Sequence, residues 1–463
     1  MTDLDDTRAA FIQAACVPRD SSHMSGTLDP ANAILAEHPE VATSDVYTAA
    51  ILGDDAGVRR FLELDRENAT SKAAPQGWDA LTHLCFSRYL RLDRARSDGF
   101  VRAATALLDA GANPNTGWFE NNHQPHPEWE SALYGAAGVA HHAELTRLLL
   151  ERGADPNDEE TPYHAPETYD NAAMKLLVES GKLTADNLTM MLLRKTDWHD
   201  YEGIKWLLEQ GIDPNRMTRW GKTALHNAVI SDNDLVIIEV LLDNGADPTI
   251  VAARPDRWSP ALLGRSAIAM AARRGRGDVL DALEQRGIPI ELEGVDRLFA
   301  ACARNDSATV RAIAEREPHL VAELLADGGK ALAEFAGVDN TDGVRQLLDL
   351  GVDVSALYDG DPYFGIAKNS TALHDAAWRA NHRTVRFLIE RGAQIDARDG
   401  NGCTPLALAV RACVDSYWTE RRSPESVEAL LRAGAAASEA PFPSGYAEVD
   451  ELLRSYRKAS RES

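Results

Sequence analysis

The chain has 463 residues, of which 72 are acidic and 48 basic, so its formal net charge is −24. This charge argues against nucleic acid or an anionic membrane surface as the main partner. The five cysteines are an odd number without a Cys-x-x-Cys pair, which is typical of reduced thiols in the cytoplasm. With an acidic start and no long apolar run, we expect an acidic, cytoplasmic protein without a signal peptide or membrane span.

Residues 1–44 are expected to form a helical cap. The first helical run places four apolar residues on one face: Phe11, Ile12, Ala15 and Cys16. Pro18 ends this run, because proline cannot continue a helix. A Ser-, Asp- and Gly-rich stretch follows over 19–29, and a second helix ends near His38.

From residue 45 onward, glycines recur at the ends of Leu-rich helical runs. A glycine after an amphipathic helix supplies the left-handed conformation that ends it, and a following proline prevents the helix from continuing. The anchor glycines lie 42, 58, 34, 42, 64, 41 and 42 residues apart, at Gly111, Gly153, Gly211, Gly245, Gly287, Gly351, Gly392 and Gly434. Such periods indicate stacked solenoid units, some of them enlarged.

A second signature precedes several anchors. The segments 221–228, 370–377 and 402–409 resemble the Gly-x-Thr-Pro-Leu-His-x-Ala start of the ankyrin repeat; the first reads Gly-Lys-Thr-Ala-Leu-His-Asn-Ala. The chain therefore resembles ankyrin-repeat proteins over residues 45–439. This resemblance implies an all-α solenoid of about 10–11 helix-turn-helix repeats with helical caps. It also implies a structural role for His226 and His374, through side-chain bonds to neighbouring backbone.

Residues 440–463 are expected to close the stack with a capping helix and a polar tail. Four apolar side chains stand at i, i+3, i+4 and i+7: Val449, Leu452, Leu453 and Tyr456. Terminal units that shield the stack from water are what a solenoid requires.

Insertions enlarge four of the intervals, at residues 115–130, 158–170, 251–263 and 359–369. Each lies between an anchor glycine and the next inner helix, which places it at a projecting finger loop. In ankyrin-like folds the fingers and the inner helices line the concave binding face. We therefore expect these insertions to alter recognition rather than the core.

The insertions of repeats 3–6 are rich in aromatic and charged residues. Because Trp, Tyr and Arg most often anchor interfaces, we expect one aromatic-walled binding surface. Its residues are Trp118, Glu120, His123, Trp129, Glu130, Tyr163, His164, Tyr169, Asp170, Arg216, Arg219 and Trp220. An alternative is that Trp118, Trp129 and Tyr163 only pack the long loops onto the scaffold.

One insertion carries histidines and carboxylates in the combination that zinc or iron uses: His123, His126, Glu128 and Glu130. Their spacing fits no metal-ligand pattern, and we identify no nucleophile beside a general base. We therefore expect no metal and no cofactor.

The resulting functional prediction is a protein partner bound on the concave face by these insertions. The alternative is a small-molecule or catalytic pocket on the same face, built from His, Glu and Asp residues of the insertions. A pocket requires those side chains to converge within hydrogen-bond reach, whereas a protein interface can spread them over a broad surface.

Overall fold

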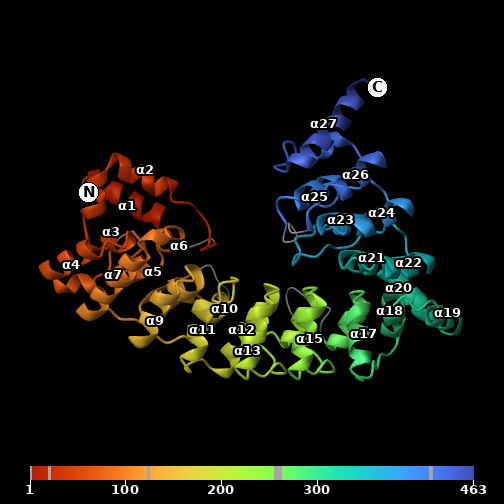
Figure 1. Ribbon diagram of the computed structural model, residues 1–463, viewed down its shortest axis with the longest axis horizontal. Coiled ribbons are helices and arrows are strands. Elements are labelled where there is room, and N and C mark those ends of the chain that lie inside the picture. The colour runs from red at the N-terminus through yellow and green to blue at the C-terminus, as the bar shows by residue number, and fades with distance from the viewer. Residues whose placement is uncertain are drawn as a thin grey trace. The chain divides into compact units, whose positions relative to one another are not determined.

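The computed structural model describes residues 3–18, 22–73, 75–121, 126–254, 263–416 and 421–462. They form two compact units, residues 1–219 and 220–463, each a series of packed helices (Figure 1). Within these ranges no helix combines the length and the apolar character needed to cross a membrane. The division into a cap over 1–44, repeats over 45–439 and a C-terminal cap over 440–463 remains a prediction.

The first unit contains two rows of helices. Its inner row of α3, α5, α8, α10 and α12 packs in that order, and the outer row of α4, α7, α9 and α11 runs alongside. The elements are α1 (Asp3–Ala15), α2 (Asp29–Glu37), η1 (Pro39–Thr43), α3 (Val46–Ile51), α4 (Asp55–Leu64), η2 (Arg66–Ala69), α5 (Ala80–Cys85), α6 (Arg88–Leu92), η3 (Arg94–Arg96), α7 (Ser97–Ala110), β1 (Gly117–Glu120), β2 (Glu128–Ser131), α8 (Ala132–Tyr134), η4 (Gly135–Val139), α9 (Ala143–Glu151), α10 (Glu160–His164), α11 (Ala172–Glu179), α12 (Ala185–Asp197) and α13 (Tyr201–Glu209).

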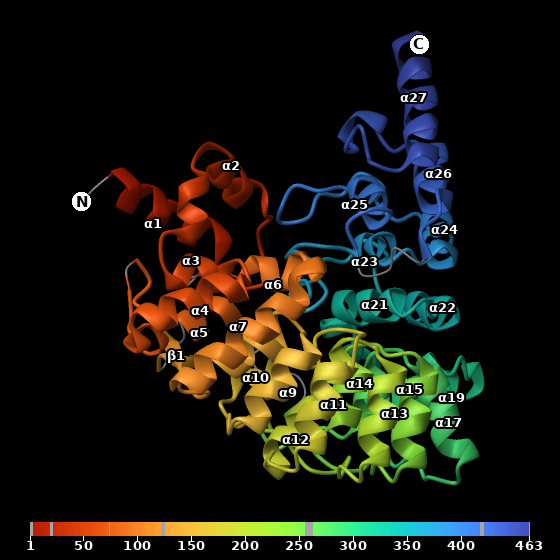
Figure 2. The same cartoon turned by 60° about the vertical axis from the view of Figure 1, so that its left-hand side comes forward.

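The second unit repeats this plan. Inner helices α14, α16 and α18 pack in sequence, as do α21, α23 and α25, and α27 follows α26 at the C-terminal end (Figure 2). The elements are α14 (Ala224–Ile230), α15 (Leu235–Asp243), α16 (Ala267–Arg273), α17 (Gly277–Gln285), α18 (Val295–Ala303), α19 (Ser307–Arg316), α20 (Pro318–Ala326), α21 (Gly328–Gly337), α22 (Thr341–Asp349), α23 (Ala372–Trp378), α24 (His382–Glu390), α25 (Pro405–Ala412), α26 (Glu425–Arg432), η7 (Ala437–Glu439) and α27 (Ala447–Glu462).

Local sequence explains where these helices begin and end. All eight anchor glycines adopt positive φ, from +72° at Gly287 to +111° at Gly111, which confirms their predicted role as helix terminators. His226 and His374 each complete a capping box with the threonine three residues earlier. The predicted structural role of these two histidines is therefore confirmed.

The core lies mainly between the two helix rows. Short inner helices such as α5 and α14 are buried on every side, whereas outer helices such as α4 bury one face only. The predicted apolar face of α1 is fully buried, since Phe11, Ile12 and Ala15 have no exposed surface. All five cysteines are free thiols.

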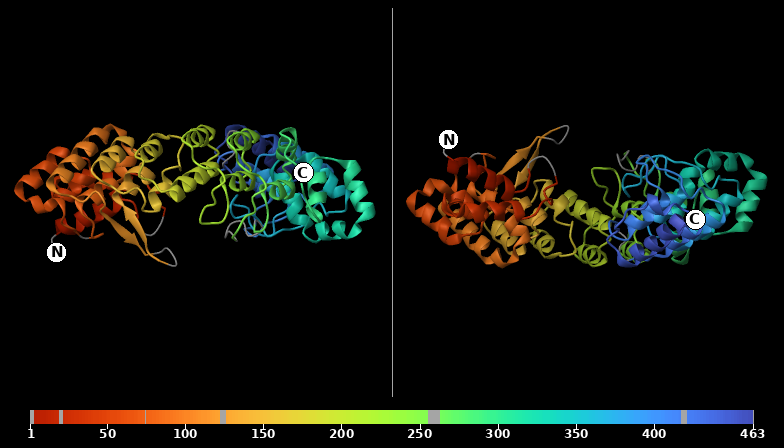
Figure 3. Two further views of the ribbon diagram at one scale, coloured as in Figure 1. Left: turned by 90° about the horizontal axis from the view of Figure 1, so that it is seen from below. Right: turned by 90° about the horizontal axis from the view of Figure 1, so that it is seen from above.

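The insertion over 115–130 contains the only strands among the ranges given above, β1 and β2. They pair as an antiparallel hairpin that projects from the helices of the first unit (Figure 3). The resemblance to ankyrin repeats predicted an inserted finger loop here, but it did not predict that the loop forms two strands. Much of the insertion over 251–263 lies outside the described residues.

Candidate functional site

The β1–β2 hairpin separates its residues into two faces, because side chains alternate along a strand. Trp118 pairs with Glu130, and Phe119 pairs with Trp129. Trp118 and Glu130 are buried, whereas Phe119 is 54 % exposed. The rings of Phe119 and Trp129 lie 4.7 Å apart on the outward face. The hairpin therefore has an inward face with Trp118 and Glu130 and an outward face with Phe119 and Trp129.

An aromatic wall lies beneath the inward face. Trp118 stacks on the buried Trp78, with ring centroids 5.2 Å apart and an interplanar angle of 28°. Phe86 meets the edges of Trp118 and Tyr134 at 5.8 Å in each case. These rings come from the segments around α5 and α8, so the hairpin packs onto two consecutive repeats.

His23, from the segment between α1 and α2, meets the inward face of the hairpin. Its Nε2 lies 4.0 Å from Oε2 of Glu120, and its Nδ1 lies 3.8 Å from Oε2 of Glu130. Nδ1 also shares a hydrogen bond of 2.8 Å with Oη of Tyr134. We call His23, Glu120 and Glu130 the His23 cluster. It joins the N-terminal segment to a finger almost a hundred residues later.

Glu130 is the most constrained member of the His23 cluster. Its side chain has no exposed surface, and among the described residues no hydrogen-bond donor reaches either carboxyl oxygen. Burial, with smaller effects from Glu160 and Glu120, raises the pKa of Glu130 to about 9. Because a buried carboxyl group is costly without a donor or a counter-charge, this residue is a candidate functional group.

A second polar cluster is centred on His164 at the end of α10. Its Nε2 donates to Oε2 of Glu160 at 3.1 Å, and its Nδ1 donates to Oε2 of Glu167 at 2.8 Å. Burial alone would lower the pKa of His164, but the two carboxylates raise it to about 9, so the imidazolium form is favoured at neutral pH. Arg194 pairs with Glu167 and lies 4.1 Å above the ring of Tyr163.

The structure brings together five of the sequence-predicted site residues, within and around these two clusters: Trp118, Glu120, Glu130, Tyr163 and His164. The ring of His164 lies 5.2 Å from that of Tyr134, which in turn contacts His23, so the two clusters adjoin. The two clusters nevertheless differ in whether their buried charged groups have partners. The His164 cluster is satisfied internally, whereas Glu130 is not.

The other predicted site residues lie elsewhere. Tyr169 is 68 % exposed, and its ring contacts that of Trp198. Asp170 is exposed and accepts a hydrogen bond from the backbone of α11. Two predicted arginines are exposed and form ion pairs, Arg216 with Asp186 and Arg219 with Glu159. Trp129 lies on the outward face of the hairpin, and Trp220 belongs to the second unit. His123 lies outside the described residues.

Sequence reasoning missed His23, Trp78 and Glu160. His23 belongs to the polar stretch assigned to the N-terminal cap, and no local spacing connects it to residues 120–130. Trp78 directly precedes Asp79, which caps α5, so the sequence indicates only the start of a repeat at this position. Glu160 follows the acidic run of the next insertion and gives no periodic signal.

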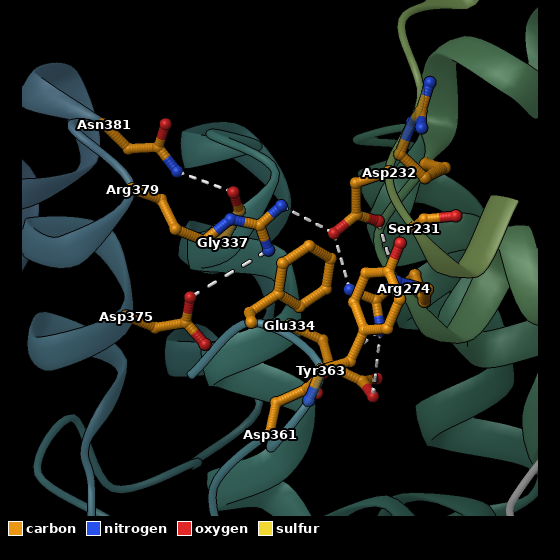
Figure 4. A network of polar contacts seen from close by, with 12 residues as sticks. Ser231, Asp232, Arg274, Glu334, Gly337, Asp361, Tyr363, Asp375, Arg379 and Asn381 are labelled. Carbon is orange, nitrogen blue, oxygen red and sulfur yellow. Dashed lines mark hydrogen bonds and ion pairs between the residues drawn. The ribbon is translucent and has the colours of Figure 1, made fainter. Parts of the chain in front are cut away.

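The second unit holds a polar pocket of about 490 Å³ along the turns that join inner to outer helices. Four arginines contribute to its lining, together with several aspartates: Arg276, Arg304, Arg379 and Arg421. At its edge Asp232 accepts two hydrogen bonds from Arg274, at 2.7 and 2.5 Å, and one from Arg379 at 2.6 Å (Figure 4).

These ion pairs form an internal network. Glu334 and Asp361 approach Arg274 at 3.8 and 3.9 Å. Burial opposes the charge on Asp232, but the two arginines outweigh it and lower the pKa of Asp232 to about 2. Because Arg379 lies 147 residues after Asp232, the network joins repeats that are distant in sequence.

Comparison with known proteins identifies the repeats. A family model described as "Ankyrin repeats (3 copies)" matches residues 190–293, 298–399 and 332–438, which together cover just over half of the chain. Serine/threonine-protein kinase 12 of Arabidopsis thaliana is 32 % identical over 84 residues, or 18 % of this chain and 17 % of the kinase. Cyclin-dependent kinase 4 inhibitor B of Bos taurus is 37 % identical over 86 residues, or 19 % of this chain and 58 % of the inhibitor.

Among solved structures, the human ASB11 ankyrin repeat domain is 23 % identical, with 59 % of this chain and 98 % of that domain covered at a TM-score of 0.24. The chain thus spans less than two thirds of both curated relatives. The family match agrees with the predicted all-α repeat architecture and with the two motifs of each repeat. Ankyrin repeats are a general protein–protein interaction module, and this chain belongs to the ankyrin-repeat family.

Proposed function

We propose that the chain binds a protein partner through the outward face of the β1–β2 hairpin. The observation that carries this proposal is the ring contact at a projecting finger between Phe119, which is 54 % exposed, and the half-buried Trp129. Two large aromatic side chains gain little by packing on each other in water, but they provide apolar area that a partner can bury. The inward face anchors the hairpin to the helices, so a partner would meet the outward face, where Phe119 is 54 % exposed.

The charge of this region favours a basic partner segment. Residues 101–200 contain sixteen acidic and seven basic residues. Opposite charge speeds association and discriminates against acidic competitors, while the aromatic pair supplies the apolar contact. We therefore expect a partner segment that combines Lys or Arg with apolar side chains, and an affinity that falls as salt concentration rises.

The alternative pocket of insertion residues finds less support. Glu120 and Glu130 are buried on the inward face of the hairpin, and His164 is held between Glu160 and Glu167. Asp170 is exposed on another loop. These side chains do not converge on one shared substrate position.

The test compares proteins captured from the native cell lysate by three forms of the full chain. The first is the wild type, and the second is the Phe119→Ser/Trp129→Ser variant. The third is a control with two exposed leucines of the same unit replaced, Leu64→Ser/Leu92→Ser. We expect a partner that the wild type and the control retain and the hairpin variant loses.

Binding of that purified partner should then be measured by calorimetry at two salt concentrations. Loss of both aromatic rings should weaken binding by at least about 2 kcal/mol, the size expected for an interface hot spot. Equal capture by all three forms, or an affinity that rises with salt, would contradict the proposal.

A further inference from the structure

We propose that His23, Glu120 and Glu130 bind one divalent transition-metal ion, with zinc as the best-fitting member of that class. One nitrogen of His23 and one carboxylate oxygen from each glutamate already lie within 4.8 Å of one another. This site is distinct from the outward hairpin face, because both glutamates point to the opposite side of the same strands. It therefore goes beyond the proposed protein interaction.

Glu130 gives the independent reason to expect a ligand. Its carboxyl group is completely buried and directed at His23, yet no donor in the described part of the chain hydrogen-bonds to either oxygen. Its nearest basic atom is Nδ1 of His23, at 3.8 Å, beyond hydrogen-bond range. Native proteins rarely leave a buried polar group in this state, and a bound cation would supply both charge and coordination.

The donor set indicates which cation fits. One imidazole and two carboxylates suit zinc and its neighbours, whereas calcium and magnesium prefer oxygen ligands alone. Zinc bonds of about 2.0–2.2 Å place ligand atoms roughly 3–4 Å apart. The separation of 4.0 Å between Glu120 and His23 is therefore nearly correct, and the widest separation needs side-chain movement of about 1 Å.

The surroundings of His23 support coordination through its ring. The hydrogen bond between Nδ1 and Tyr134 fixes the imidazole so that Nε2 faces Glu120. In metal sites the second ring nitrogen usually donates to a neighbouring acceptor, which orients the ligand and sets its tautomer; the hydroxyl oxygen of Tyr134 can accept in this way. Trp118 and Phe86 contact the same ring and exclude water from it, which strengthens charge interactions inside the cluster.

The experiment uses the full chain, first stripped with a chelator and then given zinc alone. Zinc retained after gel filtration is measured by mass spectrometry, affinity is measured by competition with a chromophoric chelator, and cobalt is added separately to record its visible spectrum. We expect one zinc ion per chain, resistant to millimolar magnesium. We also expect a cobalt spectrum typical of a site with nitrogen and oxygen ligands.

Three ligand variants and one control decide the location. His23→Gln, Glu120→Gln and Glu130→Gln should each weaken zinc binding by at least about 10- to 100-fold, since loss of a ligand costs no less than loss of a supporting group. The control is His38→Gln/Glu40→Gln, which removes an exposed His–Glu pair 3.3 Å apart. It should bind zinc as the wild type does.

Circular dichroism checks that each variant is folded, and the three ligand positions lie on three different segments, so failure of one variant to fold leaves two others. The proposal is overturned if the wild type retains no stoichiometric zinc. It is also overturned if folded ligand variants bind like the wild type, or if the exposed control loses zinc equally, which would indicate adventitious surface binding. None of these outcomes depends on the Phe119/Trp129 contact.

Discussion

Replacing Asp232 with asparagine should destabilise the second unit strongly. The carboxylate receives hydrogen bonds from Arg274 and Arg379, and all three side chains are no more than 6 % exposed. Asparagine keeps the shape of the side chain but removes its charge. Two buried guanidinium groups then lose the carboxylate that compensates them.

The magnitude follows from two independent arguments. The pKa of Asp232 falls from 3.8 to about 2, which corresponds to about 2–3 kcal/mol of stabilisation at neutral pH. Removal of one partner from a buried ion pair typically costs about 3–5 kcal/mol. We therefore expect Asp232→Asn to reduce the free energy of unfolding by between about 2 and 5 kcal/mol.

The pH dependence gives a second signature. Because the folded pKa is depressed, the stabilisation is present above about pH 4 and is lost as the pH falls toward 2. The difference between wild type and variant should therefore be largest above pH 4 and shrink toward pH 2. Urea unfolding followed by circular dichroism at several pH values measures this.

A matched control is Asp342→Asn, which breaks an exposed pair with Arg383 at 3.1 Å and should cost less than about 1 kcal/mol. The reasoning is refuted if Asp232→Asn costs no more than this control. It is also refuted if its cost does not depend on pH between 2 and 5.

Three further perturbations test other parts of the structure. Burial raises the pKa of Glu334 to about 7, so ionisation of this carboxyl group lowers the stability as the pH rises from about 4.5 to 7. In urea unfolding, Glu334→Gln should therefore have a free energy of unfolding up to about 3 kcal/mol above that of the wild type at pH 8, and no higher below pH 4.5. Lys195 is fully buried and donates to Asp200 at 2.7 Å, so Lys195→Met should lower the free energy of unfolding by about 3–5 kcal/mol. A Cβ on Gly277 would lie 2.2 Å from the carbonyl oxygen of Ala303, so Gly277→Ala should lower the melting temperature through a loss of at least about 1–3 kcal/mol.

Each of these predictions has an outcome that contradicts it. A stability gain from Glu334→Gln that persists at pH 4 would exclude ionisation as its cause. The exposed Lys205→Met serves as control for Lys195→Met, and equal effects would show that the buried pair contributes nothing. An unchanged melting temperature for Gly277→Ala would mean that the two helices separate without cost.

Local signals in the sequence were sufficient for the repeat architecture. The anchor glycines predicted left-handed helix ends, and all eight adopt them, because this conformation depends on one residue and its immediate neighbours. The same holds for His226 and His374, whose capping bonds span three residues. The buried face of α1 followed from helical periodicity alone.

The candidate site was only partly predictable. Aromatic and charged residues in the fingers identified Trp118, Glu120, Glu130, Tyr163 and His164 as a group, and the structure places these five within two adjoining clusters. Which side each residue faces depends on strand register, and the sequence did not predict strands over 117–131. That register alone separates Glu130, which is buried, from Trp129, which lies on the outward face.

The sequence by itself determined the family, the helix ends and the positions of the insertions, because each is written in contiguous residues with a fixed period. Only the tertiary structure decided which distant residues meet. His23 approaches Glu130 across 107 positions, and Asp232 meets Arg379 across 147. A solenoid stacks its units through apolar side chains packed between neighbouring helices, so the polar contacts between units are set by three-dimensional placement and leave no periodic trace in the chain.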